Sequence, residues 1–280
     1  MSYSETLVLQ KEKKYAMANS LLQDITLEGK TALVTGGTKG IGKAIAERLA
    51  RAGATVVVTA RTRPSEANSE HQFIAADLTT VEGTATVVKE VQDNFGAVDI
   101  LIENVGGLRA PGGGFSVLTD EHWENELRLN LLPTIRLDRA LLPGMIAKKS
   151  GVVIHISSIA GRMPLWEVNM AYAASKAALN SYSKALANEV ANKGVRVLTV
   201  SPGGVATEPM IQFMESLGGA SGASPHEVYK NLVDRFGGVP MERMAEPEEV
   251  ASLVGFLASP AAAYLTSANY MIDGGAVSVI

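Results

Sequence analysis

Short runs of apolar and β-branched residues recur along the chain, separated by longer amphipathic stretches. The short runs lie at Thr31–Thr35, Thr55–Thr59, Gln72–Ala75, Ile100–Ile102, Val152–Ile156 and Val195–Val200. The longer stretches have helical periodicity and lie at Ile41–Ala52, Val81–Phe95, Glu121–Ala147 and Met170–Asn192. Continuous apolar strands that alternate with helices predict a parallel sheet covered by helices on both faces.

Three segments interrupt this alternation. Thr62–Glu70 is polar and contains proline, so we expect a loop there. Gly107–Gly114 and Gly218–Ser224 are rich in glycine, and the alternation resumes after each of them. We therefore interpret both as active-site loops on one scaffold rather than as linkers. Residues 1–24 lack the apolar core of a secretory signal and predict an N-terminal arm, which leaves a single domain over residues 25–280.

Composition and charge exclude several classes of protein. The net charge is −4 and the sequence pI is about 5.7, whereas a protein that binds nucleic acid or an anionic membrane needs a basic face. No apolar run reaches the ~18 residues of a transmembrane helix. The chain has no cysteine, which excludes disulfides, thiolate nucleophiles and cysteine-based metal sites and fits a reducing cytoplasm.

The histidines give no sign of a metal site. His71, His122, His155 and His226 are scattered, and none forms a cluster with other residues at the spacing of metal ligands. Surface or satisfied core histidines are the simpler interpretation. We expect no catalytic metal.

A glycine-rich turn joins the first predicted strand to the first predicted helix. Gly36 permits the tight turn, Gly40 lets the backbone approach a phosphate, and Gly42 allows close packing of helix and strand. The helix that begins near Ile41 offers free N–H groups and its positive dipole end to a pyrophosphate. The strand before the turn and the helix after it favour a dinucleotide site over an ordinary turn.

The end of the second strand indicates which dinucleotide is bound. An acid at this place binds the free ribose 2′-hydroxyl of NAD, but here Thr55–Thr59 is followed by Ala60 and Arg61. Arg61 can grip a 2′-phosphate, and Lys39 in the glycine turn is a second cation directed at the same corner. Two solvated surface charges are the alternative. We expect NADP(H).

Tyr172 and Lys176 are candidate proton-transfer residues. Their i, i+4 spacing places them on one face of a helix, and a nearby ammonium is expected to lower the phenol pKa from its usual value of about 10. Ser157 and Ser158 follow the strand Val152–Ile156, so a hydroxyl emerges at the carboxyl edge of the sheet, where doubly wound folds bind ligands. The Tyr-x-x-x-Lys motif alone is common by chance, and its value comes from this context.

Together these motifs resemble those of the short-chain dehydrogenase/reductase family. The pattern Thr-Gly-x-x-x-Gly-x-Gly at Thr35–Gly42, the serine after a strand and Tyr172-x-x-x-Lys176 all occur in the family's order. The likeness extends from about Leu27 to Gly275 and is greatest to NADP(H)-dependent ketoreductases of the 3-oxoacyl-acyl-carrier-protein reductase type. It implies a Rossmann-type α/β fold of about seven strands, the last at Tyr270–Ile272. It also implies a homotetramer or homodimer built on the helices Glu121–Ala147 and Met170–Asn192.

The resemblance assigns roles to individual residues. Tyr172 gives or takes the proton, Ser158 (with Ser157 as the alternative) binds the substrate oxygen, and Lys176 with Asn130 relays protons. The residues that it implies for cofactor binding are Gly36, Thr38, Lys39, Gly40, Ile41, Arg61, Asp77, Leu78, Asn104, Gly106, Tyr172, Lys176, Pro202, Gly203, Val205 and Thr207.

Two features near these residues are unusual. Glu103 replaces the first asparagine of the family's Asn-Asn-Ala-Gly segment, so it must find hydrogen-bond partners or stay protonated if it is buried. Pro133 is expected to kink the helix Glu121–Ala147 beside Asn130 and free a carbonyl there, although a tolerated bend would look the same.

The substrate side is less defined. Residues 208–240 mix apolar positions with the flexible Gly218–Ser224 and predict a closing lid. An apolar substrate pocket is expected from Leu108, Leu165, Trp166 and Met210. Arg109 can meet an anionic group there or be simply solvated.

Three functions are compatible with these motifs. The first is NADPH-dependent reduction of a small-molecule ketone, and the second is oxidation of an alcohol or sugar by the same chemistry. The third, a non-catalytic nucleotide sensor, is disfavoured because a sensor has no need to keep Ser158, Tyr172 and Lys176 together.

Overall fold

A sheet of seven parallel strands forms the centre of the computed structural model, which describes residues 25–63, 71–219, 222–234 and 237–278. The strands are β1 (Thr31–Thr35), β2 (Thr55–Ala60), β3 (Gln72–Ala75), β4 (Ile100–Glu103), β5 (Gly151–Ile156), β6 (Val195–Pro202) and β7 (Asn269–Ile272). They pair in the order β3-β2-β1-β4-β5-β6-β7. The predicted seven-stranded parallel sheet is thereby confirmed, whereas the predicted N-terminal arm and most of the predicted loop after β2 lie outside the described residues.

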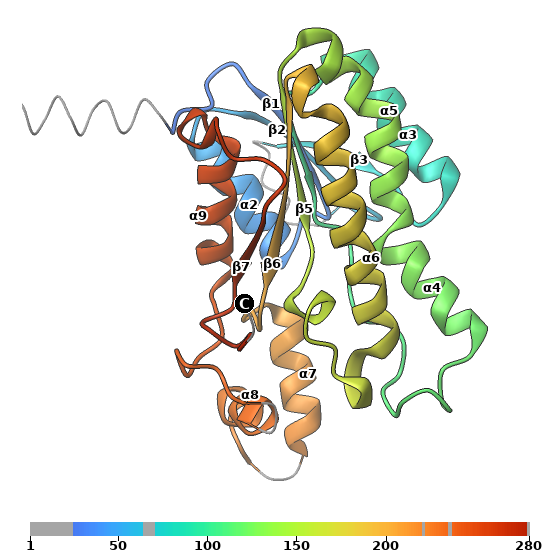
Figure 1. The fold of residues 1–280 in the computed structure, drawn as a ribbon, viewed down its shortest axis with the longest axis vertical. Helices are drawn as coiled ribbons and strands as arrows, with labels where there is room; N and C mark the ends of the chain where they lie inside the picture. Colours follow the sequence, from blue (N-terminus) through green and yellow to red (C-terminus); the bar gives the residue numbers. More distant parts are fainter. Residues whose placement is uncertain (1–24, 64–70, 220–221, 235–236, 279–280) are drawn as a thin grey trace, which may run out of the picture.

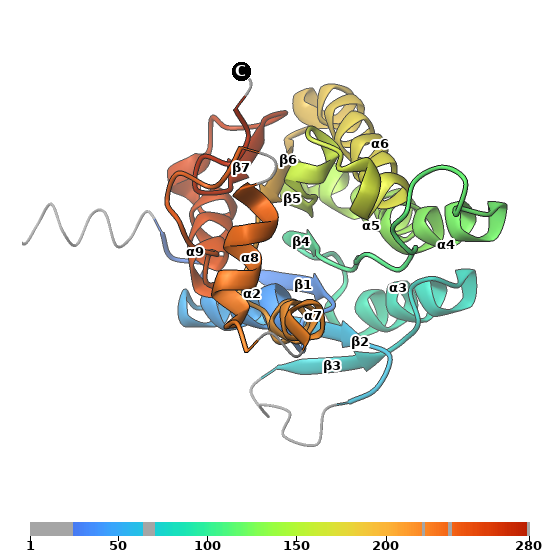
Figure 2. The same cartoon turned by 90° about the horizontal axis from the view of Figure 1, so that it is seen from below.

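Helices cover both faces of the sheet (Figure 1). They are α2 (Gly40–Arg51), α3 (Val81–Phe95), α4 (Asp120–Asn130), α5 (Leu132–Lys148), α6 (Trp166–Val190), α7 (Glu208–Gly218), α8 (Pro225–Asp234) and α9 (Pro247–Ala258). α2 and α9 lie on one face and α3, α5 and α6 on the other, while α7 and α8 lie at the end where the strands finish (Figure 2). Within the described ranges, no helix has the length and apolar character needed to cross a membrane.

The central strands bury side chains on both faces. On β1, Ala32 and Val34 pack on the side of α2 and α9, and Leu33 between them packs on the side of α3 and α5. Successive side chains of a strand point to opposite faces, so a strand covered on both sides has a continuous apolar sequence. Polar groups that serve a site must therefore emerge where the strands end.

The strand order reverses at β1, which places a crevice at this point. β1 pairs with β2 on one side and with β4 on the other. In open α/β sheets, ligands bind outside the carboxyl ends of the strands at such a switch point. The glycine turn follows β1 and Asn104 follows β4, so both border this crevice.

The helix predicted over Glu121–Ala147 is two helices in the structure. α4 ends at Asn130, α5 begins at Leu132, and Leu131 between them is non-helical with φ −129° and ψ −54°. Pro133 lies in the first turn of α5, where a missing N–H breaks no hydrogen bond. The prediction of a kink within one helix is therefore wrong, because the proline starts a new helix.

Other helix bounds also differ from the prediction. α6 begins at Trp166 rather than Met170 and contains one non-helical residue, Asn169. Its Oδ1 accepts a hydrogen bond from the backbone N–H of Leu165 at 2.9 Å, a local contact that competes with regular helix. α8 within the predicted lid and α9 after it were not predicted.

A glutamate, a histidine and an aspartate form a buried cluster under α5. Glu103 and His155 are register partners on β4 and β5, and Asp138 comes from α5. Nε2 of His155 lies 2.9 Å from Oε2 of Glu103 and 3.1 Å from Oδ2 of Asp138. Glu103 thus has an ion-pair partner in His155, while neither of its carboxylate oxygens meets the geometry of a hydrogen bond within the described residues. The expectation that no histidine clusters with carboxylates is wrong for His155, because strand register joins residues that are far apart in the chain.

The pKa values of Glu103 and His155 are both raised, so bound protons offset the negative charge of the two carboxylates in this cluster. Burial, together with the charge of Asp138, raises the pKa of Glu103 to about 8. Burial alone would lower the pKa of His155, but the charge of Asp138 and the hydrogen bonds to Asp138 and Glu103 raise it to about 10. In the described part of the chain, these three residues are the one group of potential metal ligands within 4.8 Å of each other. Their spacing is that of charge-assisted hydrogen bonds.

We predict that this cluster makes the stability of the protein fall with rising pH. Folding raises both pKa values, so the folded state holds protons that the unfolded chain releases. The stabilisation is complete below pH 4.5 and is lost as the pH rises through about 8 and then about 10. The free energy of unfolding should decline by about 1.4 kcal/mol per pH unit for each proton exchanged, measured by urea denaturation at several pH values.

The variant Glu103→Gln removes one of these protons and should flatten the decline. Glu90→Gln, at an exposed position on α3, is the control and should leave it unchanged. An equally steep decline in Glu103→Gln and in the wild type would rule out this assignment.

Candidate active site

Ser158, Tyr172 and Lys176 meet where β5 ends against α6. The hydroxyl of Ser158 lies close enough to that of Tyr172 to lower the pKa of the phenol. Nζ of Lys176 lies 5.8 Å from the centroid of the Tyr172 ring and donates to the backbone oxygen of Ile156 at 3.0 Å. The alternative serine, Ser157, is buried and donates to the backbone oxygen of Lys176 at 3.4 Å. Of the two serines, Ser158 is therefore the one that faces the tyrosine.

Burial dominates the titration of this group. It raises the pKa of Tyr172 to about 12, an effect that the Ser158 hydrogen bond opposes and the charge of Glu126 reinforces. It lowers the pKa of Lys176 to about 8, against the charge of Glu126. The expected lowering of the phenol pKa by Lys176 is thus not found. At neutral pH the phenol is protonated.

Asn130 and Gly106 adjoin Lys176. Oδ1 of Asn130 accepts from the backbone N–H of Gly107 at 2.8 Å. A Cβ placed on Gly106 would lie 2.8 Å from Oδ1 of Asn130 and 3.0 Å from Nζ of Lys176. The predicted asparagine and lysine therefore meet around the backbone of a glycine, and a side chain there would separate them.

The glycine turn has the close approaches that its sequence implies. Gly36 and Gly40 have positive φ angles of 63° and 49°, which favour glycine. A Cβ on Gly42 would lie 2.2 Å from the backbone oxygen of Gly36 and 2.5 Å from Nδ2 of Asn104. Nδ2 of Asn104 donates to the backbone oxygen of Thr35 at 3.1 Å, so the end of β4 is fastened to the turn.

A cleft of about 610 Å³ opens at the switch point beside this turn. Most of the residues predicted to bind a cofactor line it: Gly36, Thr38, Lys39, Gly40, Ile41, Arg61, Asp77, Leu78, Asn104, Gly106 and Thr207. Arg109, Asn125 and Arg128 line it as well, and the last two were missed by the sequence analysis. Neither Tyr172 nor Lys176 lines the cleft, and Lys176 adjoins it through Gly106.

The outer corner of the cleft is basic. It carries Lys39 and Arg61, and none of the described residues 61–63 after β2 is an acid. The hydroxyl of Thr59, which lines the cleft, is buried and has no hydrogen-bond partner among the described residues. Asp77 accepts from the backbone and hydroxyl of Thr79 at 3.0 and 2.8 Å, and these bonds lower its pKa. The corner therefore combines cations, a free hydroxyl and one oriented carboxylate.

The segment after β6 lies partly behind the cleft. Pro202 ends β6 beside Ile272, and Val205 is buried and bridges to Ala245. Thr207 faces the glycine turn, since a Cβ on Gly40 would lie 3.0 Å from its methyl carbon. Pro202, Gly203 and Val205 thus do not line the cleft.

The four residues predicted for the substrate pocket are also outside this cleft. Trp166 is 60% exposed and its ring lies over Gly114, while Leu108 is 40% exposed. Leu165 is half-buried, and Met210 packs into the core between α7 and α8. The lid segment is thus a pair of packed helices, of which α7 carries Met210.

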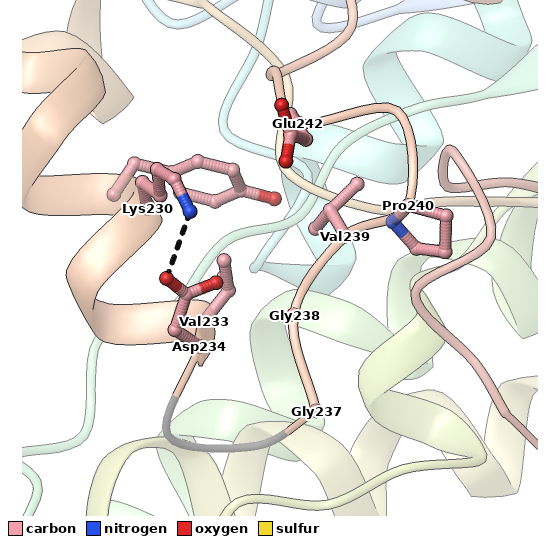
Figure 3. Close-up of a pocket in the computed structure, with 9 residues that line it drawn as sticks. Lys230, Val233, Asp234, Gly237, Gly238, Val239, Pro240 and Glu242 are labelled. Carbon is pink, nitrogen blue, oxygen red and sulfur yellow. Dashed lines mark hydrogen bonds and ion pairs between the residues drawn. The ribbon is translucent and has the colours of Figure 1, made fainter.

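A smaller cavity of about 230 Å³ lies between α8 and the loop 237–242 that follows it (Figure 3). It contains none of the predicted site residues. Its basic side chain, Lys230, points to Asp234 and is paired with it at 3.0 Å. We therefore place the chemistry in the larger cleft.

The sequence analysis missed Glu126, which is completely buried beside Asn130. It lies one helical turn before Asn130 on α4, so their i, i+4 spacing was an available signal. The signal was hidden because Glu126 stands among exposed charged residues such as Glu124 and Arg128.

Comparison with known proteins gives the same picture. Residues 30–216 match the family model of the short chain dehydrogenases. The chain is 37% identical to a 3-oxoacyl-acyl-carrier-protein reductase of Vibrio harveyi over 258 residues, which cover 90% of this chain and 98% of the relative. It is 34% identical to an acetoacetyl-CoA reductase of Allochromatium vinosum over 260 residues, which cover 88% and 98%.

A solved structure is also similar. It is that of L-sorbose reductase from Gluconobacter frateurii in complex with NADPH and L-sorbose, with 34% identity and a TM-score of 0.86. The match covers 92% of this chain and all of the other.

We predict that Gly42→Ala destabilises the protein although it lies in a helix. Alanine is favoured over glycine in a helix interior by about 1 kcal/mol. Here its Cβ would meet a backbone oxygen at 2.2 Å, and overpacking of this kind costs about 1–3 kcal/mol. The free energy of unfolding should fall, whereas in the control Gly107→Ala, where a Cβ meets nothing within 4 Å, it should not. A more stable Gly42→Ala protein would show that the turn is looser than described.

Proposed function

The chain belongs to the short-chain dehydrogenase family, and we propose that it uses NADPH to reduce a ketone to a secondary alcohol. The observation that carries this proposal is the meeting of Ser158, Tyr172 and Lys176 beside a cleft with a basic corner. The reductases among its relatives support the same chemistry.

The residues divide the work of the reduction. NADPH, when bound in the cleft, would supply the hydride that the carbonyl carbon takes up. Ser158 donates a hydrogen bond that orients the carbonyl oxygen, and Tyr172 gives that oxygen its proton. Lys176, whose ammonium lies 5.8 Å from the centroid of the Tyr172 ring, belongs to the route by which the phenolate that remains regains a proton.

The protonation state of Tyr172 suits the role of a general acid. Burial raises its pKa to about 12, so the phenol carries the proton that a reduction consumes. The alternative, an alcohol or sugar dehydrogenase, uses the same residues in the opposite direction.

The preference for NADPH over NADH rests on Arg61 and Lys39. Both line the outer corner of the cleft, where the ribose 2′-phosphate distinguishes the two nucleotides. Planar guanidinium and point-charge ammonium groups are the usual phosphate ligands.

The setting of the protein also enters this proposal. We propose that it acts in the cytoplasm, which fits the absence of cysteine, and that it assembles as a homotetramer or homodimer through α4, α5 and α6. The single domain over residues 25–280, with a lid at about 208–240, is part of the same proposal.

Removal of the guanidinium should weaken NADPH binding selectively. For Arg61→Ala we expect the Kd for NADPH to rise by about 10- to 100-fold, the value of a hydrogen-bonded charge pair, while the Kd for NADH changes little. Arg51→Ala, at an exposed position on α2, is the control. Fluorescence titration with both nucleotides measures this, and equal losses for NADPH and NADH would contradict the assignment.

Tyr172→Phe should lose turnover but keep the cofactor. Loss of a general acid lowers kcat by about a hundredfold to ten-thousandfold. NADPH oxidation should be followed with a 3-oxoacyl thioester and with a ketohexose, the two kinds of ketone that the relatives indicate. Tyr264→Phe removes the hydroxyl of a fully exposed tyrosine and is the control. If Tyr172→Phe turned over as fast as the wild type, this mechanism would be wrong.

A further inference from the structure

A buried carboxylate on α4 fastens the loop beside the cleft. Oε1 of Glu126 accepts hydrogen bonds from the backbone N–H groups of Arg109 and Ala110, each at 2.6 Å. Oε2 accepts from Nδ2 of Asn130, also at 2.6 Å. All three partners are donors, so the side chain is satisfied as an ionised carboxylate.

Asn130 connects Glu126 to the surroundings of Lys176. Its Nδ2 also donates to the backbone oxygen of Gly107 at 3.1 Å, and its Oδ1 accepts from the N–H of the same residue at 2.8 Å. The amide is thus held by the loop on one side and by Glu126 on the other. Gly106 packs against both Oδ1 of Asn130 and Nζ of Lys176. A shift of Glu126 would therefore disturb the loop, the amide and the surroundings of Lys176 together.

The charge of Glu126 also acts on both titrating residues of the site. Burial lowers the pKa of Lys176 and Glu126 opposes this, whereas burial raises the pKa of Tyr172 and Glu126 adds to the rise. A negative charge favours the protonated form of both groups. A neutral side chain at this position would lower both pKa values.

We propose that Glu126 is a positioning residue of this reductase. Its carboxylate fixes Asn130 and the loop Gly107–Ala110 beside Lys176, and its negative charge balances the buried lysine. The role rests on the ketone reduction proposed above. Glu121 and Glu124 on the same helix are exposed, so burial and three donors distinguish Glu126 from its neighbours.

Two substitutions distinguish the effect of the charge of Glu126 from the effect of its side-chain length. Glu126→Gln keeps the length and one acceptor oxygen, replaces the charge-assisted hydrogen bonds of the loop N–H groups by weaker neutral ones, and turns an amide N–H₂ toward Nδ2 of Asn130, which needs an acceptor. Glu126→Asp keeps the charge but is one methylene shorter, so it cannot hold Asn130 and both loop N–H groups at once. Glu121→Gln is the matched control, since it removes an exposed charge from the same helix.

Steady-state kinetics across pH and amide hydrogen exchange test the proposal. For Glu126→Gln, kcat should fall by about tenfold or more, and the alkaline limb of its pH profile should move to lower pH because both pKa values fall. For Glu126→Asp, the limb should stay in place while KM for the ketone rises. The N–H groups of Arg109 and Ala110 should exchange faster in both variants, and Glu121→Gln should match the wild type throughout.

The exchange measurement needs no substrate, so it separates this inference from the proposed function. If the wild type and Glu121→Gln reduce no ketone, the proposed function fails, and faster exchange at Arg109 and Ala110 in Glu126→Gln still supports the positioning role. Unchanged exchange in that variant overturns the positioning role. In an active enzyme, an alkaline limb that stays in place in Glu126→Gln overturns the charge balance.

Discussion

Burial of charge is the constraint on which the region around the cleft depends. Five ionisable side chains among the described residues are almost completely buried, namely Glu103, Glu126, Asp138, His155 and Lys176. An unpaired buried charge costs several kcal/mol, so each of these groups needs partners before the helices can close on the sheet. They gather in two places, one centred on His155 and one on Asn130. The two are joined by β5, since Lys176 donates to the backbone oxygen of Ile156, the residue after His155.

This pairing fixes how the helices sit on the sheet. Asp138 ties α5 to the strands through His155, and the ring of Tyr182 on α6 is stacked on the His155 ring with centroids 6.0 Å apart. Glu126 ties α4 to the loop. On a straight helix of about 3.6 residues per turn, Glu126 and Asp138 would face different directions. The break at Leu131 lets α4 and α5 each turn an acid inward, so the proline that follows it serves the packing of both clusters.

Local sequence patterns were enough to predict the strands of the sheet, the glycine turn and the basic corner of the cleft, whereas Asp77, Asn104 and Thr207 were predicted from the family resemblance. Each of the first three features depends on short-range properties: β-branched runs, glycine spacing, a cation after a strand. The cluster of Glu103, His155 and Asp138 depends on strand register and on how α5 packs across the strands, and no local sequence pattern indicates either of these. Glu126 is intermediate, because its spacing to Asn130 was visible but its burial was not. The expected substrate pocket rested on apolar composition alone. The structure places none of its four predicted residues in the cleft, namely Leu108, Leu165, Trp166 and Met210.

Burial also keeps Tyr172 protonated at neutral pH. A phenol at the surface would have a pKa near 10 and would be sensitive to any nearby cation. Under the helices, desolvation outweighs the hydrogen bond from Ser158, and the charge of Glu126 adds to it, so Tyr172 keeps its proton. Burial instead lowers the pKa of Lys176 to about 8. The two neighbouring side chains therefore titrate in different pH ranges. In the reduction proposed above, Tyr172 is the group that carries the proton, and Lys176, with the lower pKa, is the group that can return one to it.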